Sequence, residues 1–77
     1  MLKGSREGVL TRIQPISVHG QLSLDVQFVF CEDSTQQPQV ARLGPEAVEA
    51  GLETGDRITV QYLLGVATAV SRAPKDR

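Results

Sequence analysis

An alternating pattern of apolar and polar residues runs through residues 21–31, QLSLDVQFVFC, and it limits what this chain can fold into more than any other feature. Alternation with a period of two places the apolar residues on one face of an extended strand. The segment therefore predicts a long strand that turns one face into a core. The residues expected on this inward face are Leu22, Leu24, Val26, Phe28 and Phe30.

Shorter strands are expected on both sides of this one. Residues 8–16, GVLTRIQPI, predict a first strand whose ladder pairing ends at Pro15, because proline has no backbone N–H to donate. Residues 17–20 form the turn into the second strand. The polar segment 32–38 is expected to be an exposed loop, and QVARL after it predicts a third strand. Two further strands are expected to turn Ile58, Val60 and Tyr62, and then Val66, Thr68 and Val70, toward the core.

A short helix is predicted between the third and fourth strands, in GPEAVEAG. Pro45 suits the first position of a helix, and Gly51 can adopt the left-handed conformation that ends one. Val48 and Leu52, four residues apart, would form its buried stripe, and residues 53–56 would form the next turn. Five short strands with one helix at this place are the arrangement of a small OB-fold-like barrel, so the predicted class is mostly all-β.

The length of the chain favours one small domain over residues 1–77, with its core between residues 8 and 72. A chain of this size buries only about 60% of its unfolded surface, so help from a partner is expected. The net charge of −1 argues against a strongly basic face for nucleic acid. No apolar run approaches the roughly 20 residues that cross a membrane, and no signal segment is recognised, so a cytoplasmic protein is expected.

The residue types needed for catalysis are scarce. His19 is the only histidine and Cys31 the only cysteine, so neither a histidine-based triad nor a zinc site is expected. Cys31 is read as a strand residue with a free thiol. The phosphate-binding loop GxxxxGK[ST] is missing, and GPEAVEAG lacks the GxGxxG spacing for dinucleotides. The sequence therefore predicts a protein that is not an enzyme and has no cofactor or metal.

Nucleic-acid binding is one alternative that the fold class leaves open. OB folds bind single strands with aromatic residues that stack on bases inside a basic groove. Here Phe28 and Phe30 share the inward face, so they are expected in the core. Three arginines could gather on an outer face, although each is also an ordinary exposed strand residue: Arg12, Arg42 and Arg57. A nucleic-acid partner is therefore not expected.

Residues 8–72 resemble the transport-associated OB (TOBE) domain. GVLTRIQPI is similar to its opening strand and QLSLDVQF to its second strand. The segment PQVARLGPEAVEAGLETGDRITVQY is similar to its central phrase, which ends in a Gly-Asp turn and a strand. The likeness covers sequence, spacing and strand order together.

The TOBE resemblance implies a regulatory or accessory role. TOBE domains lie at the C-terminal end of ATP-binding subunits of ABC importers, including those for sulfate and molybdate, where they pack beside the ATPase domain and promote subunit pairing. The implied partners are such an ATPase domain or a second copy of this chain, and the implied location is the cytoplasm, peripheral to the inner membrane through the transporter. A free-standing molybdate- or oxyanion-binding protein is the alternative within the same family.

An anion site can be examined position by position. Molybdate-binding members carry a serine after the third strand and a lysine on the fourth, and the matching positions here are Gly44 and Leu63. Neither side chain can donate a charge-assisted hydrogen bond. Backbone N–H groups near Gly44 could still hold an anion. The candidate anion-binding residues are Ser17, His19, Arg42 and Gly44.

Overall fold

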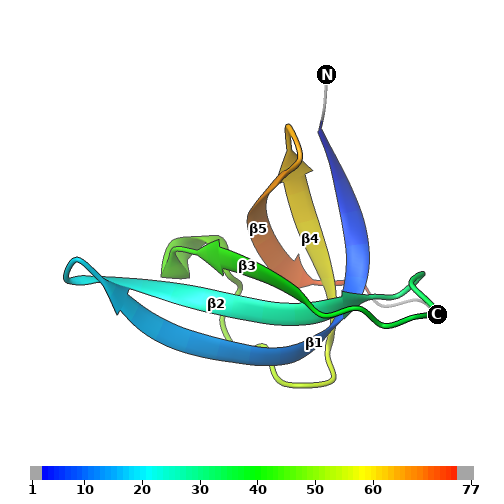
Figure 1. The fold of residues 1–77 in the computed structure, drawn as a ribbon, viewed down its shortest axis with the longest axis horizontal. Helices are drawn as coiled ribbons and strands as arrows, with labels where there is room; N and C mark the ends of the chain where they lie inside the picture. The colour runs from blue at the N-terminus through cyan, green and yellow to red at the C-terminus, as the bar shows by residue number, and fades with distance from the viewer. Residues whose placement is uncertain (1–2, 75–77) are drawn as a thin grey trace.

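The predicted strands form one antiparallel sheet. The computed structural model describes residues 3–74, so residues 1, 2 and 75–77 of the predicted domain lie outside the described part. In this five-stranded sheet the order is β3-β2-β1-β4-β5, which places β3 and β5 at its two edges (Figure 1). The elements are β1 (Lys3–Val18), β2 (Gln21–Phe30), β3 (Gln39–Leu43), the 3-10 turn η1 (Pro45–Ala47), β4 (Arg57–Leu63) and β5 (Val66–Arg72).

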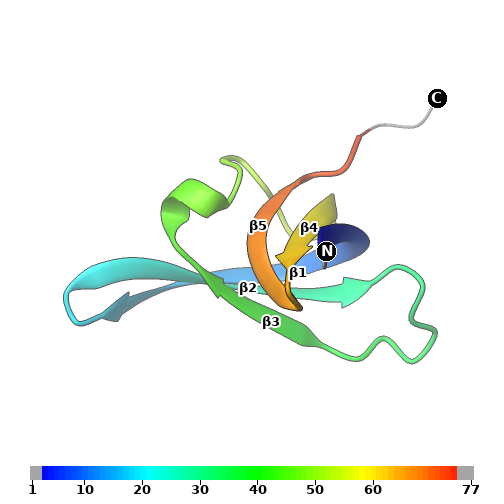
Figure 2. The same cartoon turned by 90° about the horizontal axis from the view of Figure 1, so that it is seen from above.

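The sheet curls into a barrel that stays open on one side. β3 and β5 come close to each other, although no ladder of hydrogen bonds joins them (Figure 2). We call the space between their facing edges the seam. The mostly-β class and the OB-like arrangement of five strands are therefore confirmed, with a barrel that is not closed.

The curl depends on Gly8 in β1. This residue pairs with Phe30 of β2 on one side and with Ile58 of β4 on the other. A Cβ added at Gly8 would lie only 2.6 Å from the backbone oxygen of Val29, so any side chain would force the strands apart. A glycine inside a strand often marks such a bend at a barrel corner. A register shift between Leu10 and Arg12 adds a bulge just beyond it.

The core lies inside the curl and draws on every strand. Val26, Phe28 and Phe30 of β2 are buried as predicted, and the two phenylalanine rings pack edge to face with centroids 5.4 Å apart. Leu22 was also predicted to be inward, but it is 54% exposed because β1 and β2 extend past the core as a two-stranded arm (Figure 1). The buried apolar residues are Leu10, Val26, Phe28, Phe30, Ala41, Leu43, Ile58, Val60, Val70 and Ala73.

The prediction that Pro15 ends the pairing of β1 is wrong. Pro15 pairs with Leu24, and β1 continues to Val18. From residue 10 onward β1 has β2 on one side and no β4 partner on the other. Proline is tolerated in such an edge position because its missing N–H can fall on the open side of the strand.

The predicted two-turn helix is only the single 3-10 turn Pro45–Ala47. Val48 is already extended, with φ −120° and ψ 125°, and it forms a parallel bridge with Val70 of β5. The N–H of Glu49 donates to the oxygen of Val70 at 2.9 Å. Pairing with β5 thus replaces the next helical hydrogen bonds. Val48 and Leu52 still pack against the core, as the helical prediction required.

The inward face predicted for β5 is partly wrong. Gln61 pairs with Ala69 and Tyr62 with Ala67, so Thr68 has no residue opposite it. This bulge reverses the alternation of the strand. Val70 is buried as expected, whereas Val66 is 64% exposed.

Candidate docking site at the open seam

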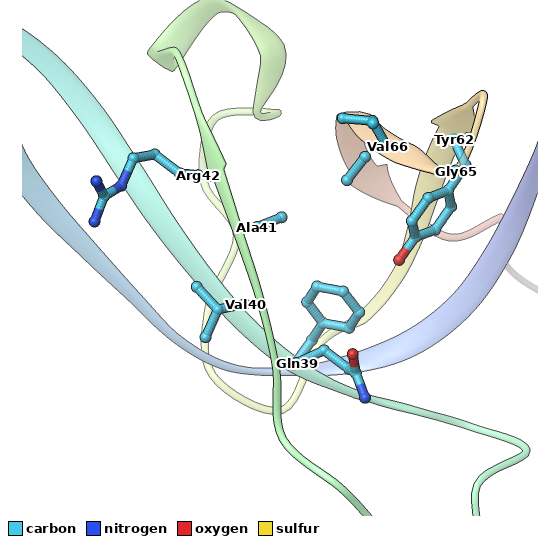
Figure 3. Close-up of a pocket in the computed structure, with 9 residues that line it drawn as sticks. Gln39, Val40, Ala41, Arg42, Tyr62, Gly65 and Val66 are labelled. Atoms are coloured by element: carbon cyan, nitrogen blue, oxygen red, sulfur yellow. The ribbon is translucent and has the colours of Figure 1, made fainter.

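A groove lies in the seam between β3 and the β4–β5 hairpin. Its volume is about 360 Å³, which is at the lower end of the range of about 300–1,000 Å³ for ligand pockets. Gln39 and Ala41 of β3 lie on the side of Tyr62, whereas Val40 and Arg42 extend to the other side of β3 (Figure 3). The lining residues are Phe28, Gln39, Val40, Ala41, Arg42, Tyr62, Gly65, Val66 and Ala67.

Tyr62 supplies a polar group to this groove. Partial burial raises the pKa of its phenol above the ordinary value, and the positive charge of Arg6 offsets part of this effect. The hydroxyl therefore keeps its proton at neutral pH and can donate a hydrogen bond to a ligand. Phe28 also lines the groove, and the one charged lining residue, Arg42, is already paired with Asp25. The groove therefore suits a neutral ligand that carries both apolar groups and hydrogen-bond acceptors.

The segment after β3 closes one end of the seam. Besides the bridge between Val48 and Val70, the N–H of Arg72 donates to Glu49 Oε1 at 2.8 Å. The guanidinium of Arg72 donates to Asp56 Oδ2 at 3.0 Å and to the oxygen of Gly51 at 3.1 Å. These contacts fix the Gly-Asp turn against β5. The seam is therefore closed at Val70 and Arg72 and open toward the start of β5.

An unusual turn borders the open end. Leu64 and Gly65 form the two-residue connection between β4 and β5, with φ of 55° and 82°. Positive φ at both positions indicates a type I′ turn, which favours Asn-Gly or Asp-Gly. Leu64 is instead a leucine in the left-handed region, and it is 66% exposed. The turn thus displays an apolar side chain at a position where local preferences oppose it.

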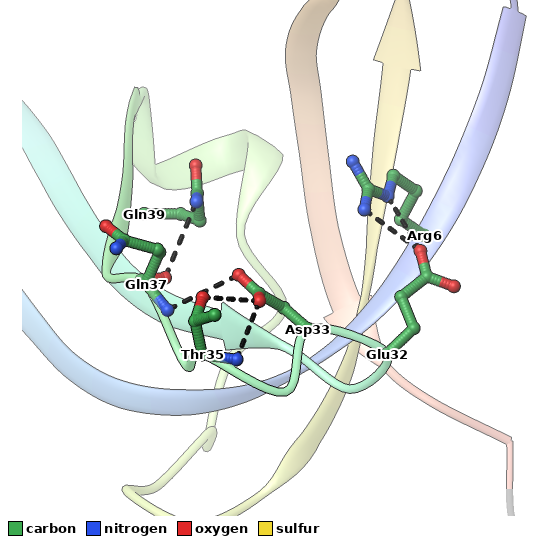
Figure 4. Close-up of polar contacts among 6 residues, drawn as sticks. All are labelled: Arg6, Glu32, Asp33, Thr35, Gln37 and Gln39. Atoms are coloured by element: carbon green, nitrogen blue, oxygen red, sulfur yellow. Dashed lines mark hydrogen bonds and ion pairs between the residues drawn. The ribbon is translucent and has the colours of Figure 1, made fainter.

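The loop before β3 is ordered by Asp33. Its carboxylate accepts hydrogen bonds from the N–H of Thr35 at 3.0 Å, the hydroxyl of Thr35 at 2.6 Å and the N–H of Gln37 at 3.3 Å (Figure 4). These bonds, led by the one from the Thr35 hydroxyl, lower the pKa of Asp33. Gln39 Nε2 donates to the oxygen of Gln37 at 3.4 Å. The loop thereby sets the position of β3 at the edge of the groove.

The predicted anion-binding residues Ser17 and Arg42 do not lie together. Arg42 pairs with Asp25 in the sheet, and Asp25 pairs with Gln14 of β1. Ser17 is three residues farther along β1, roughly 10 Å away along the strand. An odd separation also places it on the opposite face of the sheet. Moreover, the Arg42 guanidinium donates to both carboxylate oxygens of Asp25, at 2.9 and 3.2 Å, which lowers the pKa of that carboxyl.

The other two candidate anion-binding residues, His19 and Gly44, occupy positions that shape the backbone. His19 and Gly20 form the two-residue turn of the β1–β2 arm, both with positive φ. Gly44 precedes η1, and a Cβ there would lie 2.6 Å from Glu46 Oε2, so a carboxylate already covers this glycine. A bound anion at Gly44 would therefore meet negative charge.

Among residues 3–74, the features expected of a single-strand binder are not gathered on one surface. Phe28 and Phe30 are core residues, as the sequence predicted. The guanidinium of Arg6 lies 3.6 Å from the centroid of the Phe30 ring. It also donates to the carboxylate of Glu32, as Figure 4 shows. Arg57 lies 3.9 Å from a carboxylate oxygen of Glu7. Carboxylates thus accompany these arginines and reduce the positive potential that a nucleic acid would meet.

The described part of the chain holds neither a metal site nor a membrane-spanning helix. Among residues 3–74 no three His, Cys, Asp or Glu side chains are grouped to hold a metal ion. No helix within this part is both long and apolar enough to span a membrane. Cys31 is exposed in the turn directly after β2, with a free thiol.

Sequence reasoning missed the residues that build the groove. Tyr62 was correctly expected to turn toward the core, against which it packs, but its place in the groove was not foreseen. Leu64, in the turn that borders the groove, was given no role. The dipeptide Leu64-Gly65 was the available signal, because an apolar residue before the glycine of a tight hairpin contradicts the usual turn chemistry.

Comparisons with family models, with curated proteins and with solved structures found no match to this chain.

Proposed function

We propose that this chain is a non-catalytic accessory domain that acts by packing against another polypeptide. The observation that supports this proposal is the distribution of exposed apolar side chains over the surface. Single exposed apolar residues are ordinary, whereas a cluster of them indicates an interaction site. Among the residues that the structure describes, four of the five large exposed apolar side chains belong to β3 and the β4–β5 hairpin, the elements that border the seam: Val40, Leu63, Leu64 and Val66, with Leu22 alone on the arm.

The TOBE resemblance supplies the setting for this proposal. Under this proposal the chain is the regulatory domain of an ABC importer ATP-binding subunit, with sulfate and molybdate importers as the first candidates. It lies in the cytoplasm beside the membrane-bound transporter and promotes the pairing of ATPase subunits. Neutral groove chemistry and exposed apolar groups support a protein partner over an anion, because Arg42 is already paired with Asp25 and Gly44 is covered by Glu46.

Calorimetry with a purified ATP-binding domain from a sulfate or molybdate importer tests this proposal. We expect binding to the chain that is weakened by Leu64→Lys and unaffected by Leu22→Lys, since both leucines are exposed but only Leu64 borders the seam. Calorimetry also measures whether the chain binds molybdate, tungstate, sulfate or single-stranded DNA. Binding of one of these, with no binding to the ATPase domain and no self-association, would replace the proposal with one of the two alternatives.

A further inference from the structure

The backbone at the seam defines a more specific partner. β3 is an edge strand, and every second residue of an edge strand turns its N–H and C=O away from its neighbour. Within the described residues, no backbone hydrogen bond outside the ladder with β2 involves Gln39–Leu43. Such an edge is a template for a further strand. The unpaired N–H and C=O groups of β3 are therefore best matched by the backbone of another extended segment.

Within the described part of the chain, the opposite side of the seam is also unpaired over the same stretch. Backbone contacts to the outer edge of β5 begin at Val70, where Glu49 donates its N–H. Nearer the hairpin, Gly65, Val66 and Ala67 line the groove that faces Gln39 and Ala41. The open stretch is thus bounded by a strand edge on one side and by neutral side chains on the other.

We propose that the seam accepts one extended segment of a partner polypeptide, which pairs with β3 and completes the barrel. This inference rests on the proposed packing function and names the part of the partner that is bound. The entering segment would place an uncharged apolar side chain against Phe28 and Tyr62. Its neighbouring side chains would point outward beside Val40, whose side chain extends away from the groove (Figure 3).

The size of the site favours a short segment over a second copy of the chain. Stable interfaces between folded proteins use roughly 20–30 residues on each side. The groove has nine lining residues, and η1 and the following segment close its other end. Strand addition needs less surface, because main-chain hydrogen bonds give affinity and a pocket for alternate side chains gives specificity.

Protection of the edge is also weak. Natural edge strands usually carry charges, prolines or bulges that discourage pairing. In β3 the one charged residue, Arg42, is held by Asp25 on the neighbouring strand, and Pro38 precedes the strand. Gln39, Val40 and Ala41 beside the groove are uncharged. This part of the edge is consistent with a strand that is meant to be paired.

Selection from a displayed library of random ten-residue peptides, followed by synthesis of the selected peptides, tests the proposal. We expect sequences with alternating apolar residues, and binding about tenfold weaker when two alternate peptide nitrogens are methylated, since this removes donors and leaves side chains unchanged. Val66→Lys should weaken binding at least as much, while the matched change Leu22→Lys should not. Both side chains are more than half exposed, so neither variant should unfold the protein.

Several outcomes would overturn strand addition. These are a selection that yields no binder, binding that is indifferent to N-methylation or to Val66→Lys, and a chain dimer in sedimentation that Val66→Lys dissolves. The outcomes also distinguish failure of strand addition from failure of the importer proposal. If an ATP-binding domain binds the wild-type chain and Val66→Lys equally, the proposed packing function is supported and strand addition at the seam is refuted. If peptides bind in the seam but no ATPase domain binds, the importer setting falls instead.

Discussion

Replacing Gly8 with alanine tests the account of how β1 bends. The new Cβ would lie 2.6 Å from the oxygen of Val29 and 3.3 Å from the ring of Phe28. The backbone contact cannot be relieved by rotating a side chain, so the β1–β2 pairing must shift. Such overpacking destabilises by about 1–3 kcal/mol. Domains of this size have a free energy of unfolding of about 4–12 kcal/mol, from roughly 0.05–0.15 kcal/mol per residue.

Gly4→Ala is the matched control in the same strand. A Cβ at Gly4 meets nothing within 4 Å, and alanine there restricts the unfolded chain, so we expect equal stability or a gain of about 0.4–1 kcal/mol. Urea unfolding and thermal unfolding, both followed by circular dichroism, measure the free energy of unfolding and the Tm of both variants. A loss of about 2 kcal/mol at Gly8 should lower the Tm by roughly 8–16 °C. Equal stability of the two variants would refute the close approach of β1 and β2 at Gly8.

Three further predictions concern the turn, the closed end of the seam and acid stability. Leu64→Asn should raise the Tm, with a gain of about 1 kcal/mol in thermal unfolding, because asparagine tolerates the left-handed conformation better than leucine. Arg72→Gln should cost about 1 kcal/mol, as expected for a partly exposed ionic cluster, and should speed exchange of the Glu53 N–H, which donates to the Asp56 carboxylate that Arg72 holds; unchanged exchange would contradict the clamping role of Arg72. The pKa values of Asp25 and Asp33 are lowered by their partners, so the unfolded chain takes up protons at higher pH than the folded one. Stability should hold above about pH 4 and fall as the pH drops through the folded pKa values, and Asp33→Asn should flatten the acid limb of a Tm-versus-pH curve.

The strands could be predicted from the sequence because their signal is local. Alternation in β2 was enough to place Val26, Phe28 and Phe30 in the core. The bulge at Thr68 was not predictable, because it depends on how β5 aligns with β4. For this reason the groove residue Val66 was assigned to the wrong face.

The candidate site was harder to predict because it arises from separate parts of the chain. The short helix was overestimated because Val48 pairs with Val70, twenty-two positions later in the chain, instead of continuing the helical hydrogen bonds. The same pairing closes one end of the seam and thereby shapes the groove. The sequence analysis considered Arg42 as an anion-binding group, whereas the structure pairs it with Asp25 beside a groove whose other lining residues are uncharged, next to a free strand edge.

Amide hydrogen exchange with and without a bound partner tests the central claim most directly. The account predicts that binding slows exchange at Gln39–Leu43 and at the start of β5, because a new strand occupies the open edge. Exchange in the β1–β2 arm around His19 should not change. Protection confined to the arm, or spread over the outer faces with no change in β3, would contradict completion of the barrel by a partner strand.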